Sequence, residues 1–113
     1  MIKISSDIID KAIRHLEKHY PCEDDVYVKI LEGFDTVMEP GGKMGFGVYA
    51  TNERAIYIAG DLPDDEYAIV TTMAHEYKHF LQHMSGEEFN EKDAVEFGEK
   101  IYMEMKKEER RCF

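Results

Sequence analysis

Two long stretches of helical periodicity, residues 62–84 and 87–110, constrain the fold more than any other feature of the chain. Ser85 and Gly86 separate them, and a glycine readily takes the positive φ that ends a helix. Asp64 is the expected N-cap of the first helix, because acidic groups suit the positive end of a helix. The sequence therefore predicts a helical hairpin, in which residues equidistant from the turn lie level with each other.

A further helix is predicted near the N-terminus. Apolar residues recur at helical spacing from Ser6 to about Tyr20, with Ser5 or Ser6 as the N-cap. Pro21 stops this helix, because proline has no backbone N–H to continue the hydrogen bonding.

Three segments rich in β-branched and aromatic residues predict strands at residues 26–31, 46–51 and 55–59. Residues 40–45 are expected to be a flexible loop without a nucleotide role, since they lack the spacing of a phosphate-binding loop and no helix comes directly after them. The order helix, strands, helix, helix predicts an α+β fold, and the length predicts a single domain spanning residues 1–113.

Composition narrows the classes of partner. There are 14 Lys+Arg against 24 Asp+Glu, and this acidic excess argues against binding nucleic acid or an anionic membrane. A basic stretch on a substrate would suit this acidic chain better.

No apolar run approaches the roughly 20 residues of a membrane helix, and no signal-peptide core is evident, so we expect a soluble, cytoplasmic protein. Cys22 and Cys112 are expected to be free thiols. The choice between monomer and dimer stays open.

Residues 75–79 form an H-E-x-x-H motif within the first helix of the hairpin. His75 and His79 stand about 40° apart on one helical face, so both imidazoles can reach one metal ion. Glu76 lies to one side, where it can reach a metal-bound water without ligating the metal, as a general base must. The alternative is a solvent-facing histidine pair on an amphipathic helix. Small and polar residues share the arc of the two histidines: Ala68, Thr71, Thr72 and Gln82.

A zinc hydrolase site needs a third protein ligand, and Glu91 is the strongest candidate. Residues 79 and 91 are equidistant from Ser85, so Glu91 should lie level with His79. Asp93 and Glu96 point to other sides of the second hairpin helix and remain the alternative ligands. Glu91 would also simply suit the N-terminus of that helix. The stripe that contains Glu91 continues with small and apolar residues: Ala94, Gly98, Ile101 and Met105.

Two segments of the chain, residues 74–81 and 91–98, resemble the zincin metallopeptidases of the gluzincin type. The first carries H-E-x-x-H, and the second is similar to the E-x-x-A-x-x-F-[AG] pattern of the gluzincin glutamate helix. The order of elements is similar to that of the minigluzincins, which have a backing helix, a small three-stranded sheet, an active-site helix and a glutamate helix. One position departs from the pattern: many gluzincins have Asp or Asn four residues after the ligating glutamate, and here Val95 takes that place.

The resemblance implies a zinc-dependent metallopeptidase acting on a peptide or protein. It implies one catalytic Zn²⁺, held by His75, His79 and Glu91, with Glu76 as the general base. The alternative function, from a different class, is a catalytically silent zinc-binding domain with a regulatory or interaction role.

The three remaining histidines are expected to lie outside the site. His83 lies roughly 12 Å along the helix from His75, too far to share an ion, and is expected at the surface or in a supporting position. His15 and His19 also have i, i+4 spacing, but no glutamate comes directly after His15. We expect this pair on an exposed helix face, where it could bind adventitious metal.

Other features suggest roles around the site without deciding them. The strand at residues 55–59 leads toward the metal helix and is similar to the zincin strand along which a substrate adds as a further strand. Since minigluzincins resemble latent enzymes, the C-terminal tail is a candidate plug, with Cys112 as a candidate zinc ligand. Such a plug requires the tail to fold back or to come from another subunit. Three tyrosines are candidate donors to the oxyanion: Tyr57, Tyr77 and Tyr102.

Overall fold

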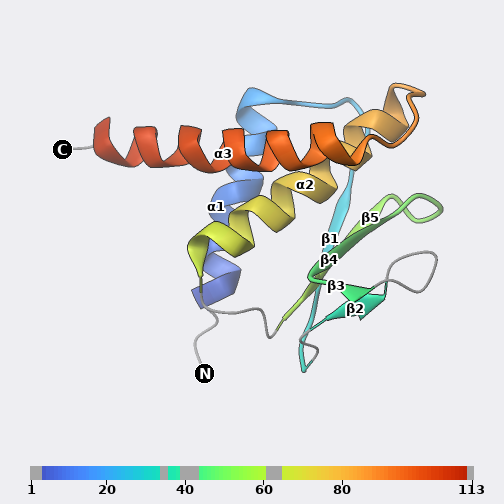
Figure 1. Ribbon diagram of the computed structural model, residues 1–113, viewed down its shortest axis with the longest axis horizontal. Coiled ribbons are helices and arrows are strands. Elements are labelled where there is room, and N and C mark those ends of the chain that lie inside the picture. The colour runs from blue at the N-terminus through green and yellow to red at the C-terminus, as the bar shows by residue number, and fades with distance from the viewer. Residues whose placement is uncertain (1–3, 34–35, 39–43, 61–64, 112–113) are drawn as a thin grey trace.

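The computed structural model describes residues 4–33, 36–38, 44–60 and 65–111, and its three helices and small three-stranded sheet confirm the α+β prediction (Figure 1). The elements in chain order are α1 (Ile4–His19), β1 (Tyr27–Leu31), β2 (Val37–Met38), β3 (Met44–Gly45), β4 (Gly47–Ala50), β5 (Ala55–Ala59), α2 (Glu66–Met84) and α3 (Glu91–Arg111).

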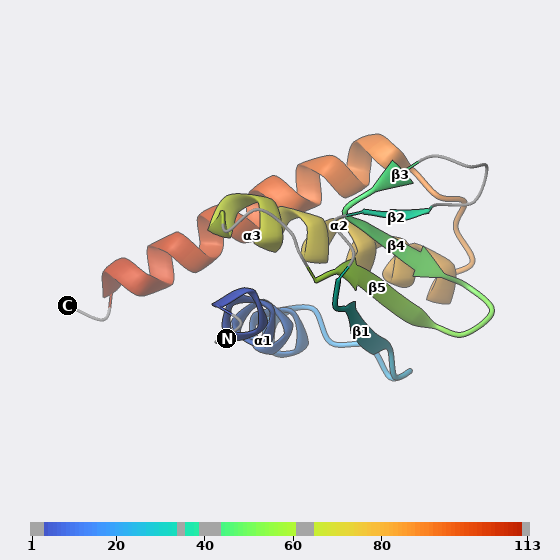
Figure 2. The ribbon, with the colours of Figure 1, turned by 90° about the horizontal axis from the view of Figure 1, so that it is seen from below.

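Helix α2 is the central element. It packs against α1 and α3, and also against strands β4 and β5, so that the sheet and α3 lie on different sides of it (Figures 1 and 2). Its apolar face carries Ile69, Val70, Met73 and Phe80, all at most 1% exposed. Burial of large apolar side chains is the main driving force for folding, so this face anchors α2 firmly.

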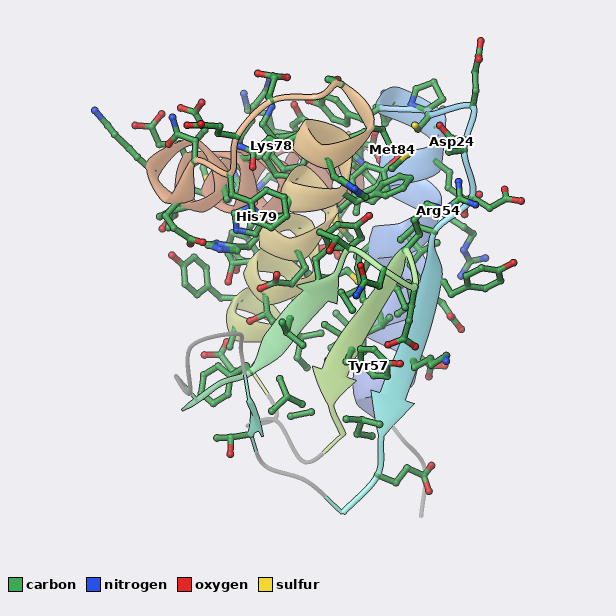
Figure 3. All side chains as sticks on the ribbon, turned by 90° about the vertical axis from the view of Figure 1, so that its right-hand side faces the viewer. Asp24, Arg54, Tyr57, Lys78, His79 and Met84 are labelled. Carbon is green, nitrogen blue, oxygen red and sulfur yellow. The ribbon has the colours of Figure 1, made fainter. Side chains whose placement is uncertain are left out.

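The main sheet has the strand order β1-β5-β4, with β5 parallel to β1 and antiparallel to β4. Ile56 and Ile58 of β5 are fully buried, whereas Tyr57 lies on the outer face of the sheet, where Lys29 is 5.4 Å from its ring centroid (Figure 3). Since β5 is paired along both edges, it cannot accept a substrate strand, and that expectation is wrong. The edge strand next to α2 is β4.

Strands β2 and β3 form a second, two-stranded antiparallel sheet that the sequence did not predict. Met44 and Gly45 belong to the segment expected to be a flexible loop, while residues 40–43 of that segment lie outside the described residues. A strand of two residues is too short to show a period-2 pattern, which is why it could not be recognised.

The helix starts differ from the predicted ones at each helix. Helix α1 begins at Ile4, so Ser5 and Ser6 lie inside it and neither is its N-cap. The N-cap of α2 is Asp65, whose side chain accepts a hydrogen bond from the Tyr67 N–H at 3.0 Å. The expected cap, Asp64, lies outside the described residues.

Helix α3 begins at Glu91 and not at residue 87. The side-chain oxygen of Asn90 accepts a hydrogen bond from the Asp93 N–H at 3.0 Å, in the manner of an N-cap. Residues 87–90 form an irregular connection before it. Asn90 therefore decides where α3 starts, and places Glu91 in its first turn.

The turn after α2 has the geometry expected from its glycine. Gly86 has φ +73°, its N–H donates to the His83 carbonyl at 3.1 Å, and the Glu87 N–H donates to the Gln82 carbonyl at 2.9 Å. This pair of bonds is the Schellman arrangement, which satisfies the last carbonyls of a helix. It directs the chain back along α2.

Helices α2 and α3 approach closely because small residues line their contact. Ala94 is fully buried, and a Cβ placed on Gly98 would lie 2.9 Å from the Thr71 carbonyl oxygen. The predicted stripe on α3 is thus confirmed as its packing face, with Ile101 and Met105 continuing it.

Two smaller expectations concern the membrane and the cysteines. Among the described residues, no helix combines the length and the hydrophobicity that crossing a bilayer requires. Cys22 is a free thiol, as expected, and Cys112 lies outside the described residues.

We predict that Gly98→Ala destabilises the protein by about 1–2 kcal/mol, although alanine normally stabilises a helix relative to glycine. The reason is that the added methyl meets the backbone of α2, which cannot move aside without separating the helices. Urea unfolding measures the effect. Val95→Ala, on the exposed face of the same helix, is the control and should change stability by less than about 0.5 kcal/mol. A gain of stability in Gly98→Ala would contradict the close approach.

Candidate metal centre

The structure brings His75, His79 and Glu91 together across the turn between α2 and α3. One carboxylate oxygen of Glu91 lies 2.9 Å from His75 Nε2, and the other lies 2.9 Å from His79 Nε2. Glu91 is thus level with His79, as predicted. His79 projects from α2 and is 5% exposed at its side chain, whereas the Glu91 side chain is 72% exposed (Figure 3). We call these three residues the first cluster.

The spacing of the first cluster suits a tetrahedral ion. One ligand atom from each residue can be chosen so that all three lie within 4.8 Å of one another. Zinc bonds of about 2.0–2.1 Å place neighbouring tetrahedral ligands about 3.4 Å apart. The two separations of 2.9 Å, each to a different oxygen of Glu91, lie about 0.5 Å below this spacing, and the chosen ligand atoms lie within 4.8 Å, so side-chain rotation can bring all three to one ion. Two histidines and one glutamate are also a ligand set of catalytic zinc sites, which leave a fourth position open.

Gln82 fixes which nitrogen of His79 faces Glu91. The side-chain oxygen of Gln82 accepts a hydrogen bond from the Asn90 N–H at 3.2 Å, and the side-chain NH₂ of Gln82 donates to the Asn90 carbonyl at 3.3 Å. These two bonds determine the orientation of the Gln82 amide. The same oxygen lies 2.9 Å from His79 Nδ1, which must therefore carry the proton. In the neutral ring, Nε2 then presents its lone pair to Glu91, as a metal ligand requires.

Gln82 also gives the first cluster a support that the residue at position 95 cannot provide. Val95, at that position, is 53% exposed and can offer no hydrogen bond from its side chain. Gln82 is 3% exposed, and it connects His79 to Asn90, the residue that precedes Glu91. Helical spacing placed Gln82 near the histidines, but this supporting role was missed, because the i+3 spacing from His79 was its only signal.

Phe89 is a second residue that sequence reasoning missed. Its ring stacks on His79 with a centroid distance of 4.6 Å and an interplanar angle of 30°. The Phe89 side chain remains half exposed, at 46%. It therefore covers one face of the imidazole and helps to hold the ring in place. No pattern in the sequence marks such a contact.

Glu76 lies beside the first cluster but is not part of it. It is 5% exposed, and a Cβ placed on Gly47 would lie 3.3 Å from Glu76 Cγ. Strand β4 thus passes directly over the α2 turn that carries Glu76. Glu76 is therefore buried between α2 and the edge strand of the sheet, one residue along the helix from His75.

The alternative third ligands are not at the site. Asp93 and Glu96 are exposed on α3, and neither belongs to a group of potential ligands within the described residues. His83 is not a ligand either: its Nδ1 lies 2.8 Å from the hydroxyl of Tyr49, which is buried on β4. His83 therefore connects α2 to the edge strand.

The three tyrosines considered as oxyanion donors lie elsewhere. Tyr77 is buried and donates its hydroxyl to the Tyr20 carbonyl at 2.6 Å. Burial raises the pKa of Tyr77 to about 12. Tyr57 lies on the outer face of the sheet, and Tyr102 packs against Tyr67 at a centroid distance of 5.0 Å, well along α3. No oxyanion donor can be assigned from these three.

The C-terminal tail leads away from the first cluster. Helix α3 continues to Arg111 and carries the chain to the end of the molecule opposite the α2–α3 turn (Figure 1). The 21 residues from Glu91 to Arg111 span roughly 30 Å of helix. Up to Arg111 the tail therefore does not fold back over the cluster, and Cys112 lies outside the described residues.

Comparison of the chain with protein-family models, with curated proteins and with solved structures finds no match. The function is therefore inferred from the geometry of the described residues.

We predict that Gln82→Met lowers the free energy of unfolding by about 1–3 kcal/mol, because it leaves buried polar groups of His79 and Asn90 without partners. It should also weaken Zn²⁺ binding at the first cluster by roughly 10–100-fold. Urea unfolding and competition with a chelator measure the two effects. Gln82→Glu is the matched control, since it keeps an acceptor for His79 and should lose less. Equal Zn²⁺ affinity in Gln82→Met and the wild type would contradict the positioning role.

We also predict that Tyr77 makes stability fall at alkaline pH. Its pKa is about 12 in the folded protein and about 10 in an unfolded chain. Between these values the unfolded state has lost the proton and the folded state has kept it, so stability falls as pH rises, by at most about 1.4 kcal/mol per unit. Urea unfolding below pH 10 and between pH 10 and 12 should show a smaller fall in Tyr77→Phe. An identical fall in both proteins would refute the assignment.

Proposed function

We propose that this chain is a zinc-dependent metallopeptidase of the gluzincin type, which hydrolyses peptide bonds. The observation that carries the proposal is the contact of one carboxylate, Glu91, with both imidazoles of the H-E-x-x-H motif at 2.9 Å. Helical spacing alone accounts for His75 and His79 sharing a face. It does not account for an acidic side chain from another helix meeting both of their Nε2 atoms.

The residues of the first cluster fit a zinc ion by chemistry as well as by spacing. His75, His79 and Glu91 would be the three protein ligands, and Gln82 keeps the Nε2 lone pair of His79 directed toward Glu91. Zinc bound there would supply a Lewis acid, which polarises the scissile carbonyl and makes water a nucleophile near neutral pH.

Glu76 is the proposed general base. It takes a proton from the attacking water and later delivers it to the leaving amine. Two observations support this role: Glu76 follows His75 directly in the motif, and it is 5% exposed beneath strand β4, the proposed binding edge. No described residue competes for this role within the H-E-x-x-H helix turn, because the other acidic residue of the site, Glu91, faces both histidines.

Strand β4 is the proposed binding edge for the substrate. The Ala59 N–H donates to the Phe46 carbonyl at 2.9 Å. Because backbone groups alternate in direction along an antiparallel strand, the N–H and C=O of Val48 also point toward β5. The backbone groups of Gly47 and Tyr49 then point to the other edge of β4. A peptide that adds there as a further strand would pass close to Glu76, and its recognition would rest mainly on backbone hydrogen bonds. The acidic net charge of −10 favours a basic substrate.

We predict that Glu76→Gln retains one Zn²⁺ at the first cluster and loses peptide hydrolysis by roughly 10²–10⁴-fold. The amide keeps the size of the side chain but cannot take up a proton. Elemental analysis of the purified protein and cleavage of an unstructured basic peptide library measure the two properties.

The control for this experiment is Glu91→Gln, which should lose hydrolysis and the Zn²⁺ of the first cluster, because it removes a ligand of that cluster. Undiminished turnover in Glu76→Gln would remove Glu76 from the mechanism. A wild-type protein that binds zinc at the first cluster but cleaves no peptide would instead support the second function, a silent zinc-binding domain.

A further inference from the structure

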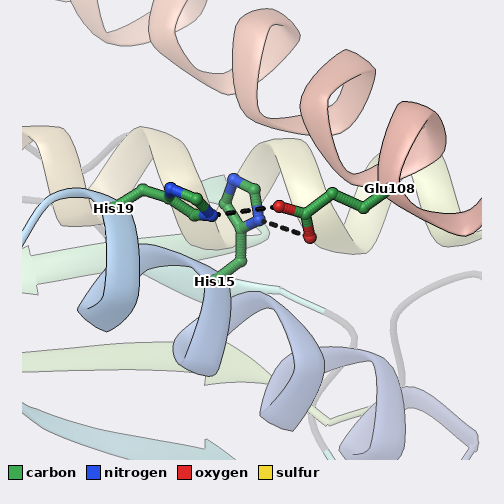
Figure 4. Close-up of side chains that lie close together, drawn as sticks. All are labelled: His15, His19 and Glu108. Atoms are coloured by element: carbon green, nitrogen blue, oxygen red, sulfur yellow. Dashed lines mark hydrogen bonds and ion pairs between the residues drawn. The ribbon is translucent and has the colours of Figure 1, made fainter. Parts of the chain in front are cut away.

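A second group of potential metal ligands lies between α1 and α3, far from the H-E-x-x-H motif in the sequence. It consists of His15, His19 and Glu108, which we call the second cluster (Figure 4). One Glu108 oxygen lies 3.0 Å from His19 Nε2, and the other lies 3.4 Å from His15 Nδ1. The expectation that both histidines occupy an exposed helix face is wrong for His15, which is 6% exposed and contacts Glu104 and Glu108 of α3.

His15 has a buried nitrogen that lacks a hydrogen bond. Its Nε2 lies 2.9 Å from Glu104, and an ionised carboxylate only accepts hydrogen bonds, so the ring proton is on Nε2. In the neutral ring Nδ1 is then a lone pair directed toward the Glu108 carboxylate. Among the described side chains, His15 Nδ1 is the only buried polar atom without a hydrogen-bond partner. A lone pair on a buried nitrogen that faces a carboxylate is unfavourable unless a cation lies between them or Nδ1 carries a proton; here the His15 side chain is 4% exposed and that of Glu108 is 49% exposed.

Glu104 supports His15 in the way that a carboxylate supports a metal-binding histidine. It accepts the His15 Nε2 proton through one oxygen and the Tyr20 hydroxyl through the other, at 2.9 and 2.8 Å. A histidine that ligates through one nitrogen usually donates from its other nitrogen to a carboxylate, carbonyl or water, which orients the ring. The second cluster thus has a supporting residue for one ligand, as Gln82 supports His79 in the first cluster.

Spacing, charge and access also suit a divalent ion. The separations of 3.0 and 3.4 Å from Glu108 to the two imidazoles are close to the ligand spacing of about 3.4 Å in tetrahedral zinc sites. The two carboxylates, Glu104 and Glu108, would balance two positive charges. A surface pocket of about 360 Å³ opens at the cluster and gives an ion a path from solvent. Its lining is His15, His19, Tyr20, Glu104, Lys107 and Glu108.

We propose that His15, His19 and Glu108 bind a second divalent transition-metal ion of the zinc class, which fastens the C-terminal end of α3 to α1. The role is structural, because the residue after His15 is Leu16, fully buried, and no acidic residue takes the place that Glu76 has in the first cluster. Residues 107–110 of α3 are exposed, so apolar packing contributes little to holding this end of the helix. A metal bridge would supply the missing restraint.

The test compares three glutamate-to-glutamine variants on the same helix. Metal-free wild-type protein is dialysed against Zn²⁺, passed over a weak chelating resin and analysed for metal. We expect two ions per chain in the wild type, one in Glu108→Gln, and two in Glu109→Gln, the matched control one residue further along. Glu91→Gln should also hold one ion, but at the other cluster, so its result reports on the proposed active site alone.

Thermal unfolding with and without Zn²⁺ gives a second measurement. In the Glu91→Gln background, Zn²⁺ should still raise the midpoint of unfolding, because the ion at the second cluster binds only the folded state. Adding Glu108→Gln to that background should abolish the rise, whereas adding Glu109→Gln should preserve it.

A measurement on the wild type avoids any dependence on the folding of variants. Long-range ¹H–¹⁵N spectra of the histidine rings should show His15 protonated on Nε2 and perturbed at Nδ1 when Zn²⁺ is added. Spectra in which His15 carries protons on both nitrogens in the presence of Zn²⁺ would overturn the proposal and identify the cluster as an ion pair.

Two metal results would also overturn it. One is a wild type that keeps a single ion, which Glu91→Gln removes and Glu108→Gln does not; the first cluster would then be the only site. The other is binding of Cu²⁺ or Ni²⁺, but not Zn²⁺, that is unaffected by Glu108→Gln, since His15 and His19 would then capture metal without the third ligand.

Discussion

The return of α3 along α2 is the constraint on which the candidate site depends. The Schellman turn at Gly86 reverses the chain, and the two hydrogen bonds between Gln82 and Asn90 then set the height at which α3 begins. A shift of one residue at this point would rotate Glu91 by about 100° and carry it away from the histidines. The same Gln82 amide also lies within hydrogen-bonding distance of His79, so one buried side chain both orients a histidine of α2 and determines where α3 begins.

Both histidine clusters use one physical arrangement. In each, two histidines one turn apart on one helix meet a glutamate from α3, and a polar side chain holds the outer nitrogen of one imidazole. The two clusters differ in the residue next to the first histidine. Glu76 comes directly after His75 and lies under the edge strand, whereas buried Leu16 comes directly after His15. The proposed chemistry therefore belongs to the first cluster, and the second can only hold an ion or an ion pair.

The spacing of residues along single segments was enough to predict the α+β fold class and to place His75, Glu76 and His79 on one helix. Helical periodicity places His75 and His79 on one face, and the position of Ser85-Gly86 made Glu91 a candidate through the symmetry of a hairpin. The helix starts were predicted poorly, because capping depends on hydrogen bonds between side chain and backbone that several neighbouring residues can make. The strand at residues 55–59, expected to be open to a further strand, is the central strand of the sheet, because strand order depends on pairing between distant segments and not on composition.

By itself, the sequence determined the residue types, their helical faces and the turn between the last two helices, since these depend on spacing along one chain segment. Tertiary structure decided which partners those faces meet: it brought Glu91, and not Asp93 or Glu96, to the two histidines of the motif. It also joined Gln82 to His79 and placed His15 against Glu104 and Glu108 of α3. Contacts between distant segments depend on how whole elements pack, and local periodicity carries no information on the distance between them.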